Sequence, residues 1–174
     1  MYCDRCGSPM AQRILEGKRR QVCIACKAVR YPDMIASVSA IVHRHHEQVV
    51  LVRRAIAPGF GQWVVPGGYV EAGESLEAAA VRETLEEVDM QLGTPCLQGV
   101  YSSPDTRILT AVYAIDGDFS RARPGLETLE VKLFALRDIP WSAVYFDITR
   151  QALADWVRKV SPRKSDLANG SCPE

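Results

Sequence analysis

Residues 67–90 have the sequence GGYVEAGESLEAAAVRETLEEVDM. A helix is predicted in the second half of this stretch, and it carries Glu83, Glu86 and Glu87 within an arc of about 100°. Like charges at these spacings repel, each pair costing about 0.2–0.5 kcal/mol, and Arg82 is the one basic residue nearby. A hard divalent cation takes oxygen ligands of this kind. We therefore predict that the three glutamates bind a metal ion.

The residues around the glutamates predict how the helix packs. An apolar stripe at helical spacing lies on the side opposite the glutamates, so we expect it to face the core. Ser75 is a candidate N-cap, and Asp89 is a candidate left-handed C-cap. The stripe consists of Ala78, Val81, Leu85 and Val88.

Upstream of this helix, Pro66-Gly67-Gly68 interrupts regular structure and lets the backbone approach a ligand closely. Glu74 lies eight residues before Arg82, so the two can meet only through the fold, where they would join the loop to the helix.

The N-terminal segment contains a second predicted metal site. Cys3 and Cys6 form one C-x-x-C pair, and Cys23 and Cys26 form another. Four thiolates close a tetrahedral zinc site with no open position, so this zinc is predicted to be structural. The segment 1–30 has few apolar side chains, and metal binding would supply the missing stability.

The same segment is basic, with seven lysine and arginine residues against Asp4 and Glu16. Such a bias occurs in nucleic-acid-binding ribbons. The whole chain is neutral, however, with 21 basic and 21 acidic residues, and only Tyr2 and Tyr31 accompany the basic residues. A solvated surface is the favoured interpretation, and nucleic acid is not the expected partner.

Length and composition indicate how the rest of the chain is organised. With 174 residues, 47% of them hydrophobic, the chain can hold a zinc ribbon at 1–32 and one larger domain at 33–160. The polar residues 161–174 predict a flexible tail. No apolar run approaches the ~20 residues of a membrane span. Metal-ligating cysteines without a targeting segment predict a cytoplasmic location.

Alternating strand and helix patterns predict an α/β fold, with a mixed β-sheet between helices. Asp147 is expected to cap a final helix whose apolar face is formed by Ile148, Ala152, Trp156 and Val160. The histidines at the predicted turn near 43–46 are interpreted as surface residues without a role. The predicted strands are 35–42, 48–53, 96–102, 106–115 and 131–136.

The glutamate-bearing stretch resembles the signature of the Nudix hydrolases, G-x5-E-x7-R-E-U-x-E-E-x-G-U, where U is aliphatic. Two positions depart from the signature: Thr84 replaces an aliphatic residue and Asp89 replaces a glycine. The matching positions are Gly68, Glu74, Arg82, Glu83, Glu86, Glu87 and Met90.

The resemblance implies hydrolysis of a diphosphate linkage with Mg²⁺ or Mn²⁺. The three glutamates, with the Gly68 carbonyl, would bind the metal beside Arg82. By resemblance the general base is Glu86, Glu87 or a glutamate of a later loop, for which Glu127 and Glu130 are the candidates.

Two groups of Nudix proteins carry a zinc ribbon. This chain lacks the SQPWPFPxS array of the NADH pyrophosphatases and is more similar to shorter proteins associated with ADP-ribose and FAD hydrolysis. Its small-molecule substrate is thus expected to contain an adenosine diphosphate half, with AMP as product. Candidate substrate contacts are aromatic or basic residues, namely Tyr31, Trp63 and Tyr101 for stacking and Arg53 or Arg54 for phosphate.

Alternatives remain open at this point: NADH or a nucleoside triphosphate as substrate, and a non-catalytic sensor or nucleic-acid-binding regulator that uses the ribbon. Sensors of this kind typically lose metal carboxylates, whereas all three are present here beside Arg82. The enzyme is therefore the favoured class. A homodimer is expected, because related Nudix enzymes often dimerise.

Overall fold

The structure is a computed structural model that describes residues 1–161. The chain divides into two compact units, Met1–Met34 and Ile35–Glu174. Beyond Ser161, the predicted C-terminal tail lies outside the described residues. Among the described residues, no helix is long and apolar enough to cross a membrane.

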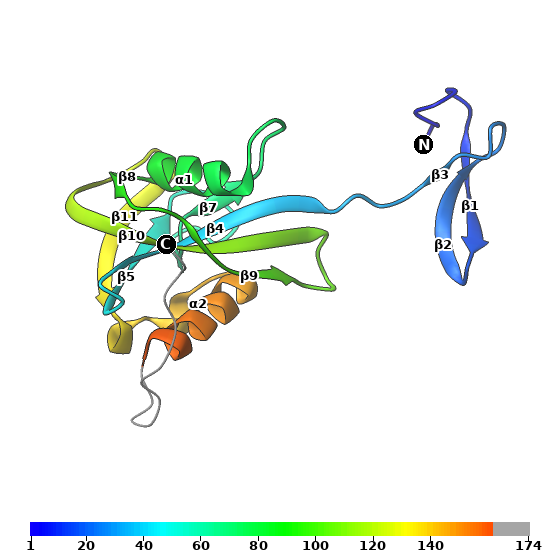
Figure 1. Cartoon of the computed structure of the whole chain (residues 1–174). Helices are drawn as coiled ribbons and strands as arrows, with labels where there is room; N and C mark the ends of the chain where they lie inside the picture. Colours follow the sequence, from blue (N-terminus) through cyan, green and yellow to red (C-terminus); the bar gives the residue numbers. More distant parts are fainter. Residues whose placement is uncertain (162–174) are drawn as a thin grey trace. The chain divides into compact units, whose positions relative to one another are not determined.

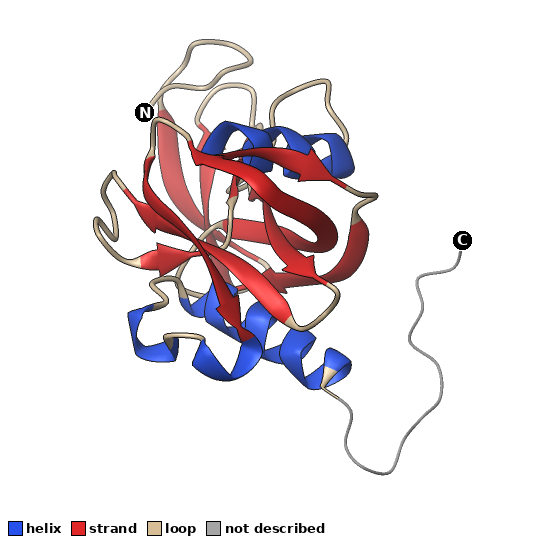
Figure 2. Ribbon diagram, turned by 90° about the vertical axis from the view of Figure 1, so that its left-hand side faces the viewer, coloured by secondary structure: helices blue, strands red, loops and turns tan. Residues whose placement is uncertain are grey.

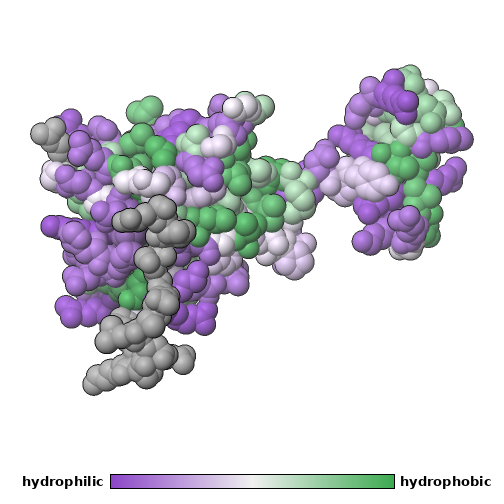
Figure 3. All heavy atoms as spheres, viewed as in Figure 1, coloured by the Kyte–Doolittle hydropathy of each residue, from purple (hydrophilic) through white to green (hydrophobic). Residues whose placement is uncertain are grey.

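The N-terminal unit is a three-stranded antiparallel sheet in the order β1-β2-β3. A tight turn joins β1 to β2, with positive φ at both Glu16 (50°) and Gly17 (73°), as a type I′ hairpin requires. Hydrophobic side chains also reach the surface of this unit, as Figure 3 shows, and Ile14 and Ile24 are more than half exposed. Such a unit has little apolar core of its own. Its strands are β1 (Met10–Leu15), β2 (Lys18–Cys23) and β3 (Val29–Arg30).

The larger unit is built on an eight-stranded sheet with the main order β11-β5-β4-β10-β8; β6 pairs with β5, β7 with β4 and β9 with β10. The pairing of β4 with β10 is parallel and the other pairings are antiparallel, so the sheet is mixed, as predicted. The strands are β4 (Ile35–Arg44), β5 (Gln48–Arg54), β6 (Trp63–Val64), β7 (Gly67–Tyr69), β8 (Val88–Leu92), β9 (Cys96–Ser102), β10 (Ile108–Pro124) and β11 (Thr128–Ala135).

Helices cover both faces of this sheet, α1 (Leu76–Glu87) on one and α2 (Asp147–Val160) on the other (Figures 1 and 2). Two short 3-10 helices, η1 (Leu136–Asp138) and η2 (Trp141–Ala143), lie between β11 and α2. The larger unit therefore has two hydrophobic core clusters, one on each face of the sheet. Val38, Ala40 and Val42 of β4 point into the cluster under α1, whereas Ile41 points into the cluster under α2. This alternation is the period of two expected of a strand covered on both faces.

Helix α1 begins as the sequence predicts, because the Ser75 hydroxyl accepts a hydrogen bond from the Ala78 N–H at 3.1 Å. Its end differs from the prediction. The chain passes directly into β8 with Val88 as an extended C-cap, and Asp89 is not among the residues with positive φ. Pairing of β8 with β10 replaces the left-handed cap that we expected.

The predicted core face of α1 is wrong for three of its four residues. Ala79, Ala80 and Thr84 are the buried residues of α1, whereas Leu85 is 41% exposed and Ala78 is exposed. Thr84 replaces the usual aliphatic residue and donates its hydroxyl to the Ala80 carbonyl at 2.6 Å, so its polar group is satisfied in the core. The remaining members are Val81, which is half-buried, and Val88, which is buried as predicted.

The prediction that Asp147 caps helix α2 is wrong, because Phe146 is the N-cap and Asp147 is the first residue of the helix, where it pairs with Arg150. Trp156 is buried, as predicted. The surface prediction for the histidines fails for His43, which is only 6% exposed and stacks on Trp156 at a centroid distance of 5.2 Å. The pKa of His43 is lowered to about 4, chiefly by burial; the nearby His46 contributes to this shift and Asp116 acts against it.

Candidate active site

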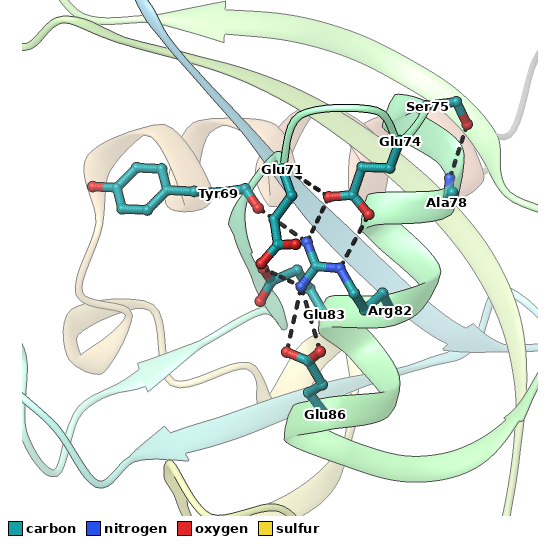
Figure 4. Close-up of polar contacts among 8 residues, drawn as sticks. All are labelled: Tyr69, Glu71, Glu74, Ser75, Ala78, Arg82, Glu83 and Glu86. Carbon is teal, nitrogen blue, oxygen red and sulfur yellow. Dashed lines mark hydrogen bonds and ion pairs between the residues drawn. The ribbon is translucent and has the colours of Figure 1, made fainter.

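Arg82, in the middle of α1, is the centre of a polar network that extends from the loop before this helix to Glu86 (Figure 4). Its Nε donates to Glu74 Oε2 at 3.0 Å and its Nη2 to Glu74 Oε1 at 2.7 Å, a bidentate pair. Its Nη1 donates to Glu83 at 2.8 Å and lies 3.4 Å from a Glu86 oxygen. The predicted contact between Glu74 and Arg82 is therefore confirmed, and one guanidinium links the loop to two of the three helix glutamates.

Backbone groups complete this network. Arg82 Nη2 donates to the Tyr69 carbonyl at 3.1 Å, and Glu74 Oε1 accepts the Glu71 N–H at 2.7 Å. Side-chain patterns in a sequence do not predict such contacts, and sequence reasoning missed both residues. These hydrogen bonds lower the pKa of Glu74, with the Arg82 bonds as the main cause. Glu74 is thus an anionic partner that holds Arg82 in place.

Gly68 lies against the carboxylate of Glu83. A Cβ at this position would overlap that carboxylate, lying 2.6 Å even from the more distant oxygen, Oε1. Gly68 belongs to β7, which is fixed in register by its pairing with Val38 of β4. The lack of a side chain here leaves room for the Glu83 carboxylate beside the backbone. The predicted approach of this backbone to a ligand stays a prediction.

Glu87 is half-buried, and one of its carboxylate oxygens is fully buried. Its Oε2 has no hydrogen-bond partner among the described residues. The pKa of Glu87 is raised to about 8, chiefly by burial; Arg54 opposes this shift, and the charges of Glu83 and Glu127 add to it. The pKa of Glu83 is also raised, again chiefly by burial. Two half-buried carboxylates with too little positive charge form a site that a cation would stabilise.

The loop between β10 and β11 lies against the C-terminal end of α1. Gly125 donates its N–H to the Glu87 carbonyl at 2.9 Å, and the Glu127 carbonyl accepts the Ala55 N–H at 2.8 Å. These bonds hold Glu127 close enough for its charge to affect Glu87. Glu130, the other candidate of this region, is exposed and lies 3.8 Å from Arg53. The structure therefore brings Glu127, rather than Glu130, to the helix glutamates.

The predicted substrate contacts lie in different places. Arg54 is at the site, because its charge acts on Glu87. Tyr101 packs in the cluster under α2, on the other face of the sheet, and donates its hydroxyl to Asp155 at 3.2 Å. Tyr31 belongs to the N-terminal unit, where Arg20 lies 5.1 Å above its ring. The substrate contacts proposed for both tyrosines stay predictions.

The four N-terminal cysteines converge as predicted. All four Sγ atoms lie within 4.8 Å of one another, and the closest pairs are 3.4–3.7 Å apart. Four sulfurs at about 2.3 Å from a central zinc ion would be about 3.8 Å apart. The Ser8 N–H is the main reason why the pKa of Cys6 falls to about 6. In Cys26 the Ala28 N–H lowers the pKa, but contacts with Cys6 and the other sulfurs raise it to about 11.

The pKa shifts of Cys6 and Cys26 have opposite signs because thiolates at such short distances repel one another. Four thiolates cannot crowd together unless a cation neutralises them, and a metal ion does so. The cluster therefore fits a tetrahedral metal site.

Comparison with known proteins agrees with this fold and site. Residues 34–156 match the NUDIX domain family, and residues 1–32 match the zinc-ribbon family described as Nudix N-terminal. The chain therefore belongs to the Nudix hydrolase family and carries the family's N-terminal zinc-ribbon module. Enzymes of this family use a divalent metal ion, which agrees with the carboxylate cluster on α1.

Individual relatives extend this result. A NUDIX hydrolase of Nitrosomonas europaea superposes with a TM-score of 0.78 at 33% identity, covering 92% of this chain and 90% of that one. An ADP-ribose pyrophosphatase of Methanocaldococcus jannaschii is 32% identical over 114 residues, which is 63% of this chain and 67% of the relative. The NAD-capped RNA hydrolase NudC of Stutzerimonas stutzeri is 37% identical over 54% of this chain, but only 33% of that relative's length is covered.

Proposed function

We propose that this protein is a Mg²⁺-dependent pyrophosphatase that hydrolyses the diphosphate linkage of an ADP-X compound, ADP-ribose or FAD, and releases AMP. The observation that carries this proposal is the carboxylate cluster of α1. Glu83 and Glu87 are half-buried, and Glu86 is exposed beside them. Arg82 forms ion pairs with Glu83 and Glu86 and holds both in place.

The residues present fit a hard cation. Glu83, Glu86 and Glu87 supply carboxylate oxygens, Glu87 Oε2 is buried without a partner, and Gly68 leaves room for a carbonyl ligand beside Glu83. These residues would hold a magnesium ion, which would neutralise phosphate charge and make an attacking water more acidic. In the N-terminal unit, the corresponding proposal is a structural zinc ion held by the four cysteines.

The chain's own residues have separate roles in this proposal. Arg82 positions the helix carboxylates and, being saturated by Glu74, Glu83 and the Tyr69 carbonyl, does not itself bind the phosphates. Arg54 is the phosphate-binding candidate, since its Nη atoms make no hydrogen bond or ion pair among residues 1–161. Its planar fork suits two phosphate oxygens.

A proton acceptor for the attacking water is also needed. Glu127 is a better candidate for this proton acceptor than Glu130. Two backbone hydrogen bonds hold the Glu127 loop against the end of α1 and next to Ala55, whereas Glu130 is paired with Arg53. Glu86, the exposed member of the cluster, is the second candidate.

For the substrate, the relative from M. jannaschii named ADP-ribose pyrophosphatase supports an ADP-ribose-like compound. A second candidate is NADH or a related NAD-containing substrate. It is favoured by the NAD-capped RNA hydrolase NudC of Salmonella heidelberg, which is 27% identical over 90% of this chain and aligns over 60% of its own length. The lack of the SQPWPFPxS array argues against this second candidate.

The experiment is a product assay with Mg²⁺ on ADP-ribose, FAD, NADH and a nucleoside triphosphate, with ion-exchange separation of the products. We expect AMP with ribose 5-phosphate, or AMP with FMN. Glu86→Gln should lower kcat about 100-fold. Glu71→Gln serves as the matched control, because the Glu71 side chain makes no hydrogen bond or ion pair with Arg82 among the described residues. Lack of cleavage of all four compounds would contradict the proposal and favour a binding protein. Full activity of Glu86→Gln would contradict the proposed magnesium site.

A further inference from the structure

An aromatic pair lies next to the carboxylate site, just before α2. Tyr145 and Phe146 form an edge-to-face pair with centroids 4.9 Å apart. Both rings remain accessible, at 41% and 37% exposure. The Tyr145 N–H donates to the Trp63 carbonyl at 2.9 Å, so this segment lies beside β6, a few residues before Gly68. Exposed aromatic rings are thus fixed near the glycine turn of the active site.

Arg54 connects this aromatic pair to the carboxylates. Its guanidinium carbon lies 5.4 Å from the Phe146 ring centroid, and its charge also acts on Glu87. Arg54 Nε is used by the Pro58 carbonyl at 2.8 Å, which fixes the plane of the guanidinium. A phosphate that binds the remaining Nη atoms would therefore lie between the glutamates and the two aromatic rings.

The loop between β5 and β6 covers one side of the pair. A Cβ on Gly59 would lie 2.6 Å from the Tyr145 ring, so only a glycine lets the backbone pass this close. The Gly61 carbonyl accepts a hydrogen bond from Arg53 Nε at 2.8 Å, which helps to hold the loop in place. Phe60, at the tip of this loop, is 64% exposed. No side chain from residue 55 to residue 62 is charged, so the loop adds apolar surface without competing for a phosphate.

We infer that Tyr145 and Phe146, with the guanidinium plane of Arg54, form a stacking subsite for the aromatic heterocycle of the nucleotide substrate. This inference rests on the proposed function. The ligand is a planar heterocycle joined through a ribosyl or ribityl group to a phosphate, with the phosphate on Arg54. Stacking on aromatic and guanidinium faces tolerates different rings, because every such heterocycle has a π-face. Both adenine and isoalloxazine meet this description.

The test is isothermal titration of the full chain, in Mg²⁺, with AMP, FMN and ribose 5-phosphate. These ligands contain no diphosphate linkage, so they report binding without turnover. Phe146→Leu and Tyr145→Leu keep apolar side chains but remove the rings. We expect each to raise the Kd of AMP or FMN about tenfold and to leave that of ribose 5-phosphate within about twofold. Tyr2→Leu removes an exposed ring, 68% accessible, from the N-terminal unit and is the matched control.

The arms of this experiment separate the outcomes. Weaker AMP binding identifies adenine as the stacked ring, and weaker FMN binding identifies the flavin; either supports the subsite. Unchanged Kd values for both ligands in folded Phe146→Leu and Tyr145→Leu, or no binding of either ligand by the wild type, would overturn it. If no substrate is hydrolysed while Phe146→Leu still weakens AMP binding, the proposed function fails and the subsite stands. If hydrolysis occurs with an unchanged KM in both variants, the proposed function stands and the subsite fails.

Discussion

Replacing Gly68 by alanine tests the geometry of the carboxylate site with one methyl group. The new Cβ would lie 2.6 Å from Glu83 Oε1 and closer still to the other atoms of that carboxylate, whereas ordinary contact begins at 3.4 Å. The Glu83 carboxylate must therefore move by about 1 Å, away from its 2.8 Å hydrogen bond with Arg82. Gly68 does not have a positive φ, so alanine is compatible with the backbone.

A displacement of about 1 Å in a catalytic group costs about 100-fold in rate. We expect Gly68→Ala to lower kcat by about that factor on whichever compound the product assay identifies as substrate, with little change in the melting temperature. The assay is steady-state hydrolysis at saturating Mg²⁺, together with thermal unfolding followed by circular dichroism. Gly93→Ala is the control, because its Cβ would meet only ordinary contacts, the nearest at 3.4 Å. Activity of Gly68→Ala within twofold of wild type would refute the idea that Glu83 must occupy this position.

Three further predictions concern the parts of the molecule around this site. The folded pKa of His43, about 4, lies below its unfolded value near 6.5, so stability should fall as pH drops between these values. We expect a loss of about 2 kcal/mol from pH 7 to pH 5 in urea titrations, and a clearly smaller loss in His43→Phe; equal losses would contradict this. Arg82→Lys loses the bidentate pair with Glu74, so kcat should drop about tenfold or more and the unfolding free energy by about 1–3 kcal/mol; wild-type values of both would argue against a positioning role for Arg82. Cys6→Ser should reduce bound zinc well below one ion per chain and expose residues 1–34 to protease, while the melting transition of the larger unit stays in place because the units are separate. Retention of a full zinc ion would refute the four-cysteine site.

Much of the fold and site follows from short-range patterns. The two C-x-x-C pairs predict a convergence of four sulfurs, because each knuckle fixes its own pair and only one ion has to join them. The strands beginning at Ile35, Gln48 and Cys96 agree with the sequence pattern to within two residues at each end. In each case the information lies within a few neighbouring residues. The contact between Glu74 and Arg82 was also predicted, since their spacing allowed contact only through the fold, whereas its bidentate geometry was not.

The features that the sequence did not predict depend on long-range pairing. Strands β6 and β7 have two and three residues, too few for a periodic signal, and exist because β5 and β4 supply their partners. His43 is covered by Trp156 of α2. This residue lies more than a hundred positions away in the sequence, so a local pattern could not predict the burial of His43. The placement of Tyr145 and Phe146 beside Trp63 has the same origin.

The orientation of α1 shows how function overrides a hydrophobic pattern. An apolar stripe normally faces the core, because burying a leucine contributes about 1.5–3 kcal/mol. Here Leu85 and Val81 instead line a shallow groove with Pro95 at the surface. If this stripe faced the core, the half-buried Glu83 and Glu87 would turn toward solvent, away from Gly68 and the Gly125 loop. Small buried residues at 79, 80 and 84 allow the helix to lie close to the sheet, so the two carboxylates enter the site at its edge. The helix thus gives up apolar burial to hold two carboxylates where their pKa values are raised, and a bound cation would offset that cost.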